Sequence, residues 1–355
     1  MPDVSSAGNA AAARAKAMYG KRITRKQYQQ LTAAHTVGEI ASFLRSNTTY
    51  AAALSDIQDT TVHRGVLEQV LRRKVAMDLE KLTGYDEQID RLVTMYHRQQ
   101  IEISWILRWL RAKTEEEDDT WFLSTAITAV ASKLQPVRMN LCKTVAELEA
   151  ELQDTPYAKV LHRFAGSPTL PTVTALENAL ISDRNARLFA ATEELGGSCE
   201  AELKALIGSG SDAQNFCRIW RLKRYFHAAP AQIRTELLPS GTNISPKIWD
   251  AIIEAPTEKA AAEMFFETPF GRQIPPAERE NVDTLPEKIP YLKARQAMYF
   301  SAHALVICMA FAMLSEVELH NLIHIVEGTR YQMSAAEITK FIIFDDRKGG
   351  SGGWL

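Results

Sequence analysis

The stretch TVGEIASFLRSNTTY at residues 36–50 returns as TVAELEAELQDTPY at residues 144–157 and, more loosely, as TEKAAAEMFFETPF at residues 257–270. The aromatic residues that close the three stretches, Tyr50, Tyr157 and Phe270, lie 107 and 113 residues apart. Self-similarity at a fixed period indicates a structural unit that has been copied. The sequence therefore predicts one unit present three times along the chain.

Each stretch predicts a short helix with a defined start. Thr36 with Glu39, and Thr144 with Glu147, form the pattern of a capping box, in which the hydroxyl accepts from a free backbone N–H and the carboxylate reaches back. The third copy keeps Thr257 without the acid three residues on. Apolar residues follow at helical spacing, so each helix is expected to bury one face.

A second repeated element has nearly the same period. Amphipathic segments surround Ser104, Asn215 and Asn321, which lie 111 and 106 residues apart. Two markers with one period predict three similar helical units, arranged with pseudo-threefold symmetry into a funnel-shaped bundle. The predicted boundaries are a tail at 1–12, units at 13–118, 119–235 and 236–346, and a tail at 347–355.

Helical patterns dominate the rest of the chain, and no alternating apolar pattern is long enough for a sheet. They cover residues 59–82, 86–113, 120–133, 174–195, 211–227, 286–314, 315–330 and 334–344. Capping patterns predict helix starts at Ser211, Ser315 and Ser334, and the glycines at 208–210 predict a break. The expected fold class is all-α.

Composition favours a soluble protein of a reducing compartment. The formal net charge is −2, which argues against a protein that binds nucleic acid through overall basicity. The four cysteines are dispersed without a CxxC pair, as expected of free thiols. The N-terminus has no apolar core of a signal peptide, and the apolar run at 304–314 is short for a membrane span, so it predicts a buried core helix.

Two segments permit a sharper chemical interpretation. His320 and His324 lie four residues apart, with Glu327 on the same helical face, which is a spacing that metal ligands use. The sequence HNLIH lacks the glutamate of the HExxH motif, so a packed or solvated helix face is the main interpretation and a helical metalloenzyme is the alternative.

The second segment is the run RIWRLKRYFH at residues 218–227, which mixes cations with aromatic residues as single-strand nucleic-acid grooves do. Helical spacing places Ile219, Leu222 and Phe226 on one face, so an amphipathic helix with a cationic side explains it without nucleic acid. The acidic run at residues 114–119 predicts a solvated linker. The GSG at 208–210 lacks the lysine of a phosphate-binding loop, so we expect no ATP site.

The residues at both ends of the chain resemble one family. The opening ARAKAMYGKRITRKQYQQLTAAHTVGEIASFLRSNTTYAAAL is similar to the N-terminal region of the C-type subunit of bacterial and archaeal V-type ATPases, the counterpart of the d-type subunit of vacuolar ATPases. The segment SEVELHNLIHIVEGTRYQMSAAEI resembles the last helices of that protein. The triplicate plan extends the resemblance from about residue 13 to residue 344.

The resemblance implies a rotor adaptor of a V/A-type ATPase or ATP synthase, without an active site of its own. Such a protein sits on the membrane proteolipid ring, holds the foot of the central stalk formed by D- and F-type subunits, and transmits torque for coupled ion transport. We therefore expect a cytoplasmic protein, peripheral to the membrane, without catalytic, cofactor-binding or metal-binding residues and without nucleic acid as a partner. Partner-binding residues are not assigned, and a helical scaffold with unrelated partners is a further alternative.

Overall fold

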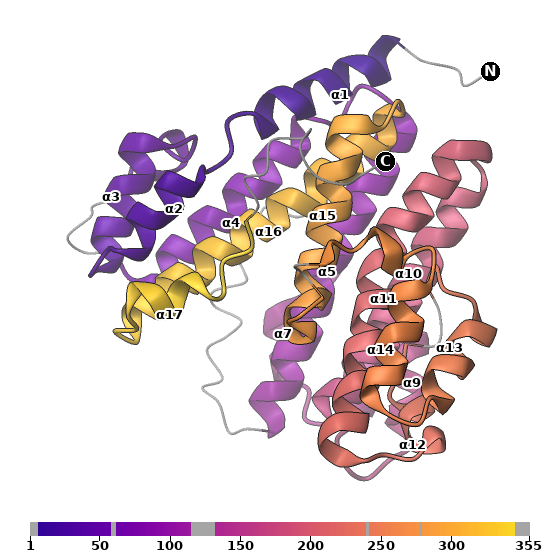
Figure 1. Cartoon of the computed structure of the whole chain (residues 1–355). Helices are drawn as coiled ribbons and strands as arrows, with labels where there is room; N and C mark the ends of the chain where they lie inside the picture. Colours follow the sequence, from indigo (N-terminus) through magenta and orange to yellow (C-terminus); the bar gives the residue numbers. More distant parts are fainter. Residues whose placement is uncertain (1–5, 58–61, 115–131, 239–240, 277–278, 345–355) are drawn as a thin grey trace. The chain divides into compact units, whose positions relative to one another are not determined.

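The computed structural model describes residues 6–57, 62–114, 132–238, 241–276 and 279–344. All regular secondary structure in these residues is helical, which confirms the all-α prediction (Figure 1). The chain divides into two compact units. Among the described residues, unit 1 joins those up to Lys143 with those from Met298 to residue 344, and unit 2 holds those from Thr144 to Ala297.

The bounds of the helices follow chain order. Unit 1 contains α1 (Ser6–Tyr19), α2 (Arg25–Thr32), α3 (Val37–Asn47), the 3₁₀ turn η1 (Ala52–Leu54), α4 (Arg64–Glu80), α5 (Glu87–Thr114), α7 (Pro136–Leu141), α16 (Ala304–Arg330) and α17 (Ala335–Thr339). Unit 2 contains α8 (Val145–Glu151), α9 (Ala158–Ala165), α10 (Val173–Glu193), α11 (Gly197–Phe226), α12 (Pro230–Thr235), α13 (Pro246–Glu254), α14 (Glu258–Glu267), the 3₁₀ turns η2 (Gly271–Gln273) and η4 (Val282–Thr284), and most of α15 (Leu285–Phe300).

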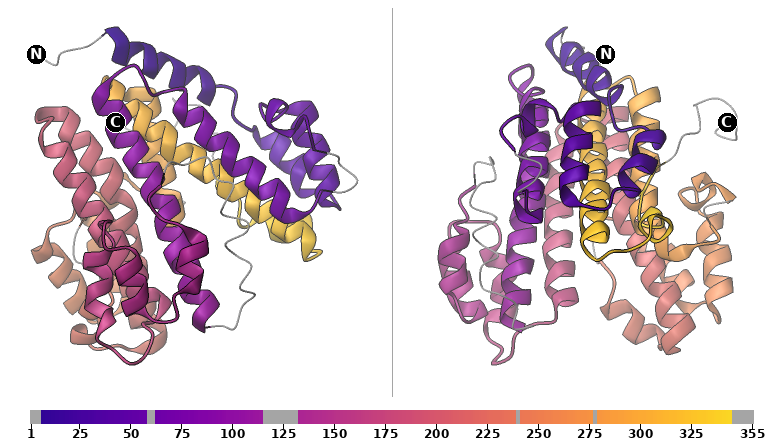
Figure 2. Two further views of the ribbon diagram at one scale, coloured as in Figure 1. Left: turned by 180° about the vertical axis from the view of Figure 1, so that it is seen from behind. Right: turned by 90° about the vertical axis from the view of Figure 1, so that its left-hand side faces the viewer.

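Unit 1 is built around α16. All residues from Leu305 to Leu314 are buried, which confirms the prediction of a core helix there. The helix packs against α1, α2, α3, α4, α5 and α17, and α1 runs beside it (Figure 2). By length and hydropathy α16 could cross a membrane, but 72% of its apolar window is buried inside the protein. The first and last helices of the chain therefore share one core.

Unit 2 is built around α11, which packs against α10, α12 and α14. Phe216 on α11 stacks on Phe265 of α14, with ring centroids 3.9 Å apart, and both side chains are fully buried. Burial of such a side chain contributes roughly 1.5–3 kcal/mol. Residue Trp249 of α13 extends the same aromatic cluster. This core ties the third repeated stretch to the helix that carries Asn215.

The three repeated stretches form three short helices, α3, α8 and α14, as predicted. The hydroxyl oxygens of their N-cap threonines accept from the backbone N–H three residues on: Thr36 from Glu39 (3.1 Å), Thr144 from Glu147 (3.2 Å) and Thr257 from Ala260 (3.1 Å). The two predicted capping boxes are formed only in their threonine half: the Glu39 carboxylate accepts from the N–H of His35 rather than from that of Thr36, and α8 likewise has the bond to the Thr144 hydroxyl without the complete box.

The ends of the three stretches also repeat their contacts. A threonine two residues before each closing aromatic donates its hydroxyl proton to the carbonyl of the preceding turn: Thr48 to Leu44, Thr155 to Leu152 and Thr268 to Phe265. A cation then lies over each closing ring: Lys74 over Tyr50 (4.4 Å), Arg187 over Tyr157 (5.4 Å) and Lys293 over Phe270 (5.7 Å). A cation over a buried ring contributes about 1–2 kcal/mol. The copies thus share their local contacts as well as their sequence.

Two predicted helix starts and one predicted break are wrong. Ser211 lies inside α11 and Ser315 inside α16, where the Ser315 hydroxyl bonds back to the carbonyl of Phe311. The glycines at 208–210 also lie inside α11, where a Cβ on Gly208 would meet the Asn243 side chain at 2.8 Å. The start at Ser334 is confirmed, with a complete capping box.

Several predictions stay open. Most of the predicted helix at 120–133 and of the acidic linker at 114–119 lies outside the described residues. The division into two compact units does not test the boundaries predicted at 118/119 and 235/236. The threefold funnel therefore remains a prediction.

Candidate partner-binding surfaces on the two central helices

The two sequence markers Asn215 and Asn321 make the same pair of hydrogen bonds. The Asn215 side chain donates to the carbonyl of Leu238 (3.1 Å) and accepts from its N–H (2.8 Å). The Asn321 side chain likewise donates to the carbonyl of Ile343 (2.8 Å) and accepts from its N–H (2.9 Å). Each amide is 1% exposed and satisfies both backbone groups of one residue. Each central helix thereby fastens the segment that follows its own short partner helix, α12 or α17.

A carboxylate three residues before each of these asparagines makes a second shared contact. Asp212 accepts from the N–H of Ile244 at 3.2 Å, and Glu318 accepts from the N–H of Ile23 at 3.0 Å. Ile23 and Ile244 each lie 13 residues before the N-cap threonine of the following repeated stretch. The last central helix therefore holds the start of the chain as α11 holds the residues that follow it.

The two acids differ in their surroundings. Asp212 is fully buried, and burial raises its pKa to about 7, although the N–H groups of Asn243 and Ile244 act in the opposite direction. Burial also lowers the pKa of Lys293 to about 8, and the charge of Asp212 partly offsets that effect. Glu318 has an additional donor, because the Tyr50 hydroxyl lies 3.1 Å from its second oxygen.

The exposed end of α11 carries aromatic rings and a guanidinium. Tyr225 and Phe226 are 58% and 72% exposed. The guanidinium of Arg224 lies 4.7 Å from the centroid of the Trp220 ring and 5.6 Å from that of Tyr225. Sequence spacing predicts Phe226 on the buried face, and this is wrong because α11 ends at that residue and the chain turns away.

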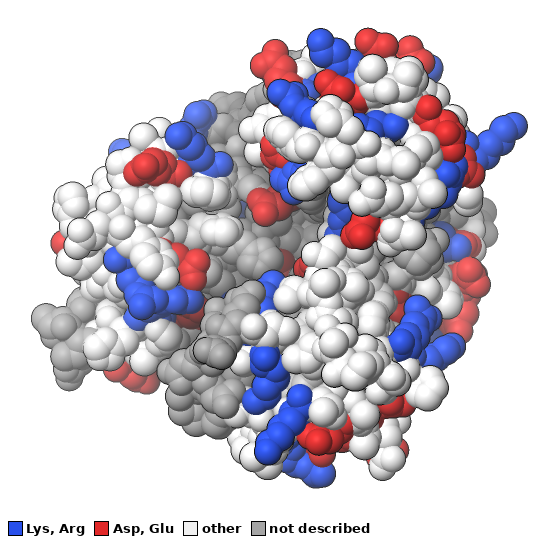
Figure 3. Space-filling view, turned by 90° about the horizontal axis from the view of Figure 1, so that it is seen from below, with Lys and Arg blue, Asp and Glu red and all other residues white. Residues whose placement is uncertain are grey.

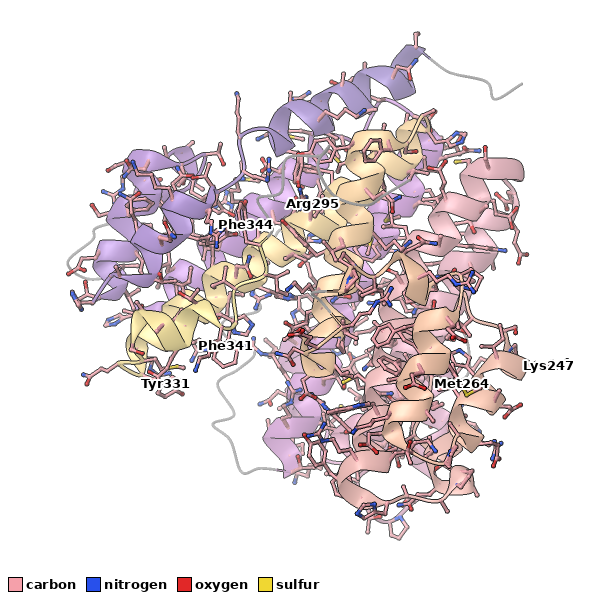
Figure 4. All side chains as sticks on the ribbon, viewed as in Figure 1. Lys247, Met264, Arg295, Tyr331, Phe341 and Phe344 are labelled. Atoms are coloured by element: carbon pink, nitrogen blue, oxygen red, sulfur yellow. The ribbon has the colours of Figure 1, made fainter. Side chains whose placement is uncertain are left out.

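The end of α16 repeats this arrangement in unit 1. The Arg330 guanidinium lies 5.4 Å from the ring centroid of Tyr331, which is 67% exposed. Beside it, Phe341 is 51% exposed and stacks on His324, with centroids 5.9 Å apart. Figure 4 shows Tyr331 and Phe341 close to the ends of α16 and α17. Exposed aromatic residues next to arginine are the residue types that dominate protein interfaces.

A left-handed residue follows each of these helix ends. His227 has φ 47° and Gln332 has φ 56°, and they are the only residues other than glycine with positive φ among those that the structure describes. Glycine is the usual residue at such a helix end, because a side chain there is strained. Both ends therefore carry a side chain at a position where glycine would be more stable.

The other cations of the predicted basic run are engaged within the protein. Arg221 pairs with Asp283 at 2.6 Å, Arg218 donates to the carbonyl of Glu236 at 3.1 Å, and Lys223 donates to that of Ala255 at 2.6 Å. Arg224, by contrast, has no carboxylate partner among the described residues. On the face shown in Figure 3, basic and acidic side chains are both scattered among larger uncharged areas. The run therefore offers a single cation beside exposed rings.

Two of the three residues of the metalloenzyme alternative make other contacts. Glu327 pairs with Arg64 at 2.6 Å, and the His324 ring stacks on that of Phe341. In the described part of the chain no three His, Cys, Asp or Glu side chains form a group that could hold a metal ion. The four cysteines are free, and burial raises the pKa of Cys308 to about 12.

The protein is thus an all-α protein in which the same local contacts recur and exposed aromatic residues lie at the ends of the central helices α11 and α16. The family model of the ATP synthase (C/AC39) subunit matches residues 11–341. The chain therefore belongs to the ATP synthase (C/AC39) subunit family, that of the V/A-type ATPases, as the sequence resemblance indicates. A search of curated protein sequences finds no match to it.

Proposed function

We propose that the protein is the rotor adaptor of a V/A-type ATPase or ATP synthase, a component without catalysis of its own. It joins the central stalk of D- and F-type subunits to the proteolipid ring, and it passes torque between them during coupled ion transport. It works on the cytoplasmic face of the membrane, to which it is held by protein contacts.

Family membership across residues 11–341 is the observation that carries this proposal. The packing of the chain supports it, because α16, close to the C-terminal end of the described chain, holds the N-terminal helices inside unit 1. Loose chain ends would absorb force by moving, whereas densely packed interiors transmit strain. A protein that carries torque needs this property in every part that bears load.

The two alternatives make different predictions. A helical metalloenzyme that uses His320 and His324 would retain stoichiometric zinc after dialysis and hydrolyse a substrate as an isolated chain. The engagement of Glu327 by Arg64 disfavours it. A scaffold for unrelated partners would bind neither the stalk nor the ring.

A bridging experiment tests the proposal. The proteolipid ring is placed in lipid nanodiscs, and the purified D–F stalk pair is added at low salt with and without the chain. We expect the stalk pair to co-sediment with ring-containing discs when the chain is present, and not with empty discs. Stalk binding that does not depend on the chain, or no binding of the chain to either partner, would overturn the proposal.

Torque transmission needs a second readout. Membranes that carry the complete complex are expected to couple ATP hydrolysis to ion uptake, and removal of the chain is expected to abolish uptake while hydrolysis by the catalytic head continues. Full ion uptake without the chain would contradict the adaptor role.

A further inference from the structure

We infer that the exposed ends of α11 and α16 are two copies of one docking element for the proteolipid ring, each taking a carboxylate next to an apolar patch on a ring protomer. This inference rests on the proposed function and adds the residues and the chemistry of one of its contacts. The element consists of Arg224, Tyr225 and Phe226 in unit 2, and of Arg330 and Tyr331 in unit 1.

The two copies share an Arg–Tyr dipeptide at corresponding positions. Tyr225 and Tyr331 each lie ten residues after the buried asparagine of their helix, Asn215 or Asn321. The sequences around the dipeptide differ, RLKRYFHAAP in one copy and VEGTRYQMSA in the other. The shared residues are exposed, so packing of the core does not require them.

Helix capping explains only part of this pattern. A cation in the last turn stabilises a helix through its dipole, which accounts for Arg224 and Arg330. It does not account for aromatic rings that are 58%, 72% and 67% exposed, because an exposed ring gains nothing from burial. Nor does it account for the side chains of His227 and Gln332 at strained positions, which cost stability and are typical of functional surfaces.

The chemistry of the element defines the ligand. The Arg224 guanidinium lies over the rings of Trp220 and Tyr225, and that of Arg330 lies over the ring of Tyr331. Neither arginine has a carboxylate partner in the described part of the chain. An arginine oriented in this way binds a carboxylate through two parallel hydrogen bonds, while the rings bury apolar surface around it. A carboxylate on the partner would thus bind the guanidinium, while apolar groups next to it pack against the aromatic rings.

The number of cations favours a protein over a membrane surface. Anionic lipid is bound by clusters of about four to eight basic residues. At the end of α11, Arg221 is neutralised by Asp283, while Arg218 and Lys223 are tied to backbone carbonyls, so of these cations Arg224 alone is free to turn to a partner, and the charges that remain are fewer than such a cluster holds. A single oriented guanidinium suits one specific carboxylate.

The repetition of the element favours the ring over the stalk. Two sites of one chemistry suit a partner that presents the same surface more than once. Of the proposed partners, the ring consists of identical protomers. The stalk presents each of its surfaces once.

The test measures binding of the full chain to ring nanodiscs, to the D–F stalk pair and to vesicles that contain phosphatidylserine. One variant carries Arg224→Ala, Tyr225→Ala and Phe226→Ala, a second carries Arg330→Ala and Tyr331→Ala, and a third combines all five changes. Phe300→Ala is the matched control, because Phe300 is 71% exposed and lies at the end of α15, outside the element. Circular dichroism and thermal unfolding check that each variant is folded.

We expect each element variant to weaken ring binding by about tenfold to a hundredfold, as removal of interface anchors does, and the combined variant to weaken it further. Stalk binding and the Phe300→Ala control should equal wild type. Because the contact is charged, wild-type ring binding should weaken with salt more steeply than that of Arg224→Ala or Arg330→Ala single variants. Tyr331→Phe should retain most of the affinity, since the ring remains.

Several results would overturn the inference. They are unchanged ring binding by the combined variant, an equal loss in Phe300→Ala, a loss of stalk binding instead, or wild-type binding to vesicles without a ring that the same variants abolish. The last result would identify a lipid surface as the partner. A wild-type chain that does not bind the ring at all would contradict the proposed function itself, which separates the two failures.

Discussion

The central helices of the two units bury carboxylates in opposite ways. Glu316 of α16 lies 2.8 Å from Nδ1 of His97, and both side chains are 9% exposed. Asp212 of α11 is held by the N–H groups of Asn243 and Ile244. Burial raises the pKa of both acids, but the hydrogen bond and charge of His97 outweigh it at Glu316, whose pKa is lowered. The sign therefore depends on the side chain within hydrogen-bond distance of the carboxylate and not on the depth of burial alone.

The pH dependence of stability follows from these two signs. The pKa of Asp212 is about 7 in the folded protein and near 3.8 when unfolded, so the folded state binds more protons and loses stability as pH rises from about 4 to above 7. Glu316 has a lowered pKa in the folded state, so its contribution is present above the unfolded value of 4.5 and is lost as pH falls. The two units should therefore respond oppositely to acid.

The largest expected effect concerns the buried asparagine that each central helix carries. Asn215→Ala or Asn321→Ala leaves an N–H and a carbonyl of the bracketed residue without a partner, and each buried orphan costs about 1–3 kcal/mol. We expect each variant to lower the free energy of unfolding by roughly 4 kcal/mol, measured by urea unfolding. Hydrogen exchange should increase near Leu238 in the first variant and near Ile343 in the second.

Gln30→Ala is the control for these variants, because Gln30 is exposed on α2 and should shift stability by less than about 0.5 kcal/mol. If either asparagine variant lost no more free energy of unfolding than Gln30→Ala, the stabilising role of this pair of hydrogen bonds would be refuted. Faster exchange at the wrong segment would refute the pairing of each helix with its own segment.

The second effect concerns the pH dependence of stability in variants of the two buried carboxylates, Asp212 and Glu316. Asp212→Asn removes a group that resists ionisation, so the variant should gain roughly 2–4 kcal/mol relative to wild type between pH 5 and pH 8. Glu316→Gln should instead be less stable than wild type at pH 7, and this deficit should shrink toward pH 4. Urea unfolding across this pH range measures both.

Asp283→Asn serves as the control for the pH series, since Asp283 is exposed and pairs with Arg221 at the surface. A surface pair contributes about 0–1 kcal/mol, so its pH profile should stay close to that of wild type. Parallel profiles for Asp212→Asn and Glu316→Gln would contradict the opposite signs.

The smallest effect concerns the strained helix ends. His227→Gly and Gln332→Gly relieve a left-handed side chain, and each should raise the free energy of unfolding by about 0.5–1 kcal/mol. Thermal unfolding should report a higher midpoint for both. Destabilisation by either change would show that the side chain, rather than the backbone conformation, holds the helix end.

Much of the fold could be predicted because the repeated stretches carry their own start signals. Thr36, Thr144 and Thr257 cap their helices as the pattern indicates. The starts predicted at Ser211 and Ser315 failed because a hydroxyl inside a helix can bond to the previous turn or to a neighbouring helix, as Ser315 does with Phe311 and Ser211 with Asn185. Sequence pattern alone does not separate these two uses of serine.

The candidate surface could be predicted only in part. The period of the sequence repeat identified Asn215 and Asn321 as markers. The structure shows that each one hydrogen-bonds the backbone of a segment that follows its helix. The exposure of Phe226 was missed, because helical periodicity assumes that the helix continues past it. The Arg–Tyr dipeptide shared by the two copies was a signal that could have identified the helix ends, since internal repetition of exposed residues is not needed for packing.

The most direct measurement for the whole account is a single-particle structure of the complete ATPase complex that contains this chain. We expect one copy of the chain between the proteolipid ring and the D–F stalk, with Tyr225 and Tyr331 in contact with ring protomers and each arginine paired with a carboxylate. A chain found outside the rotor, or one in which both tyrosines remain in solvent while other surfaces hold the ring, would contradict it.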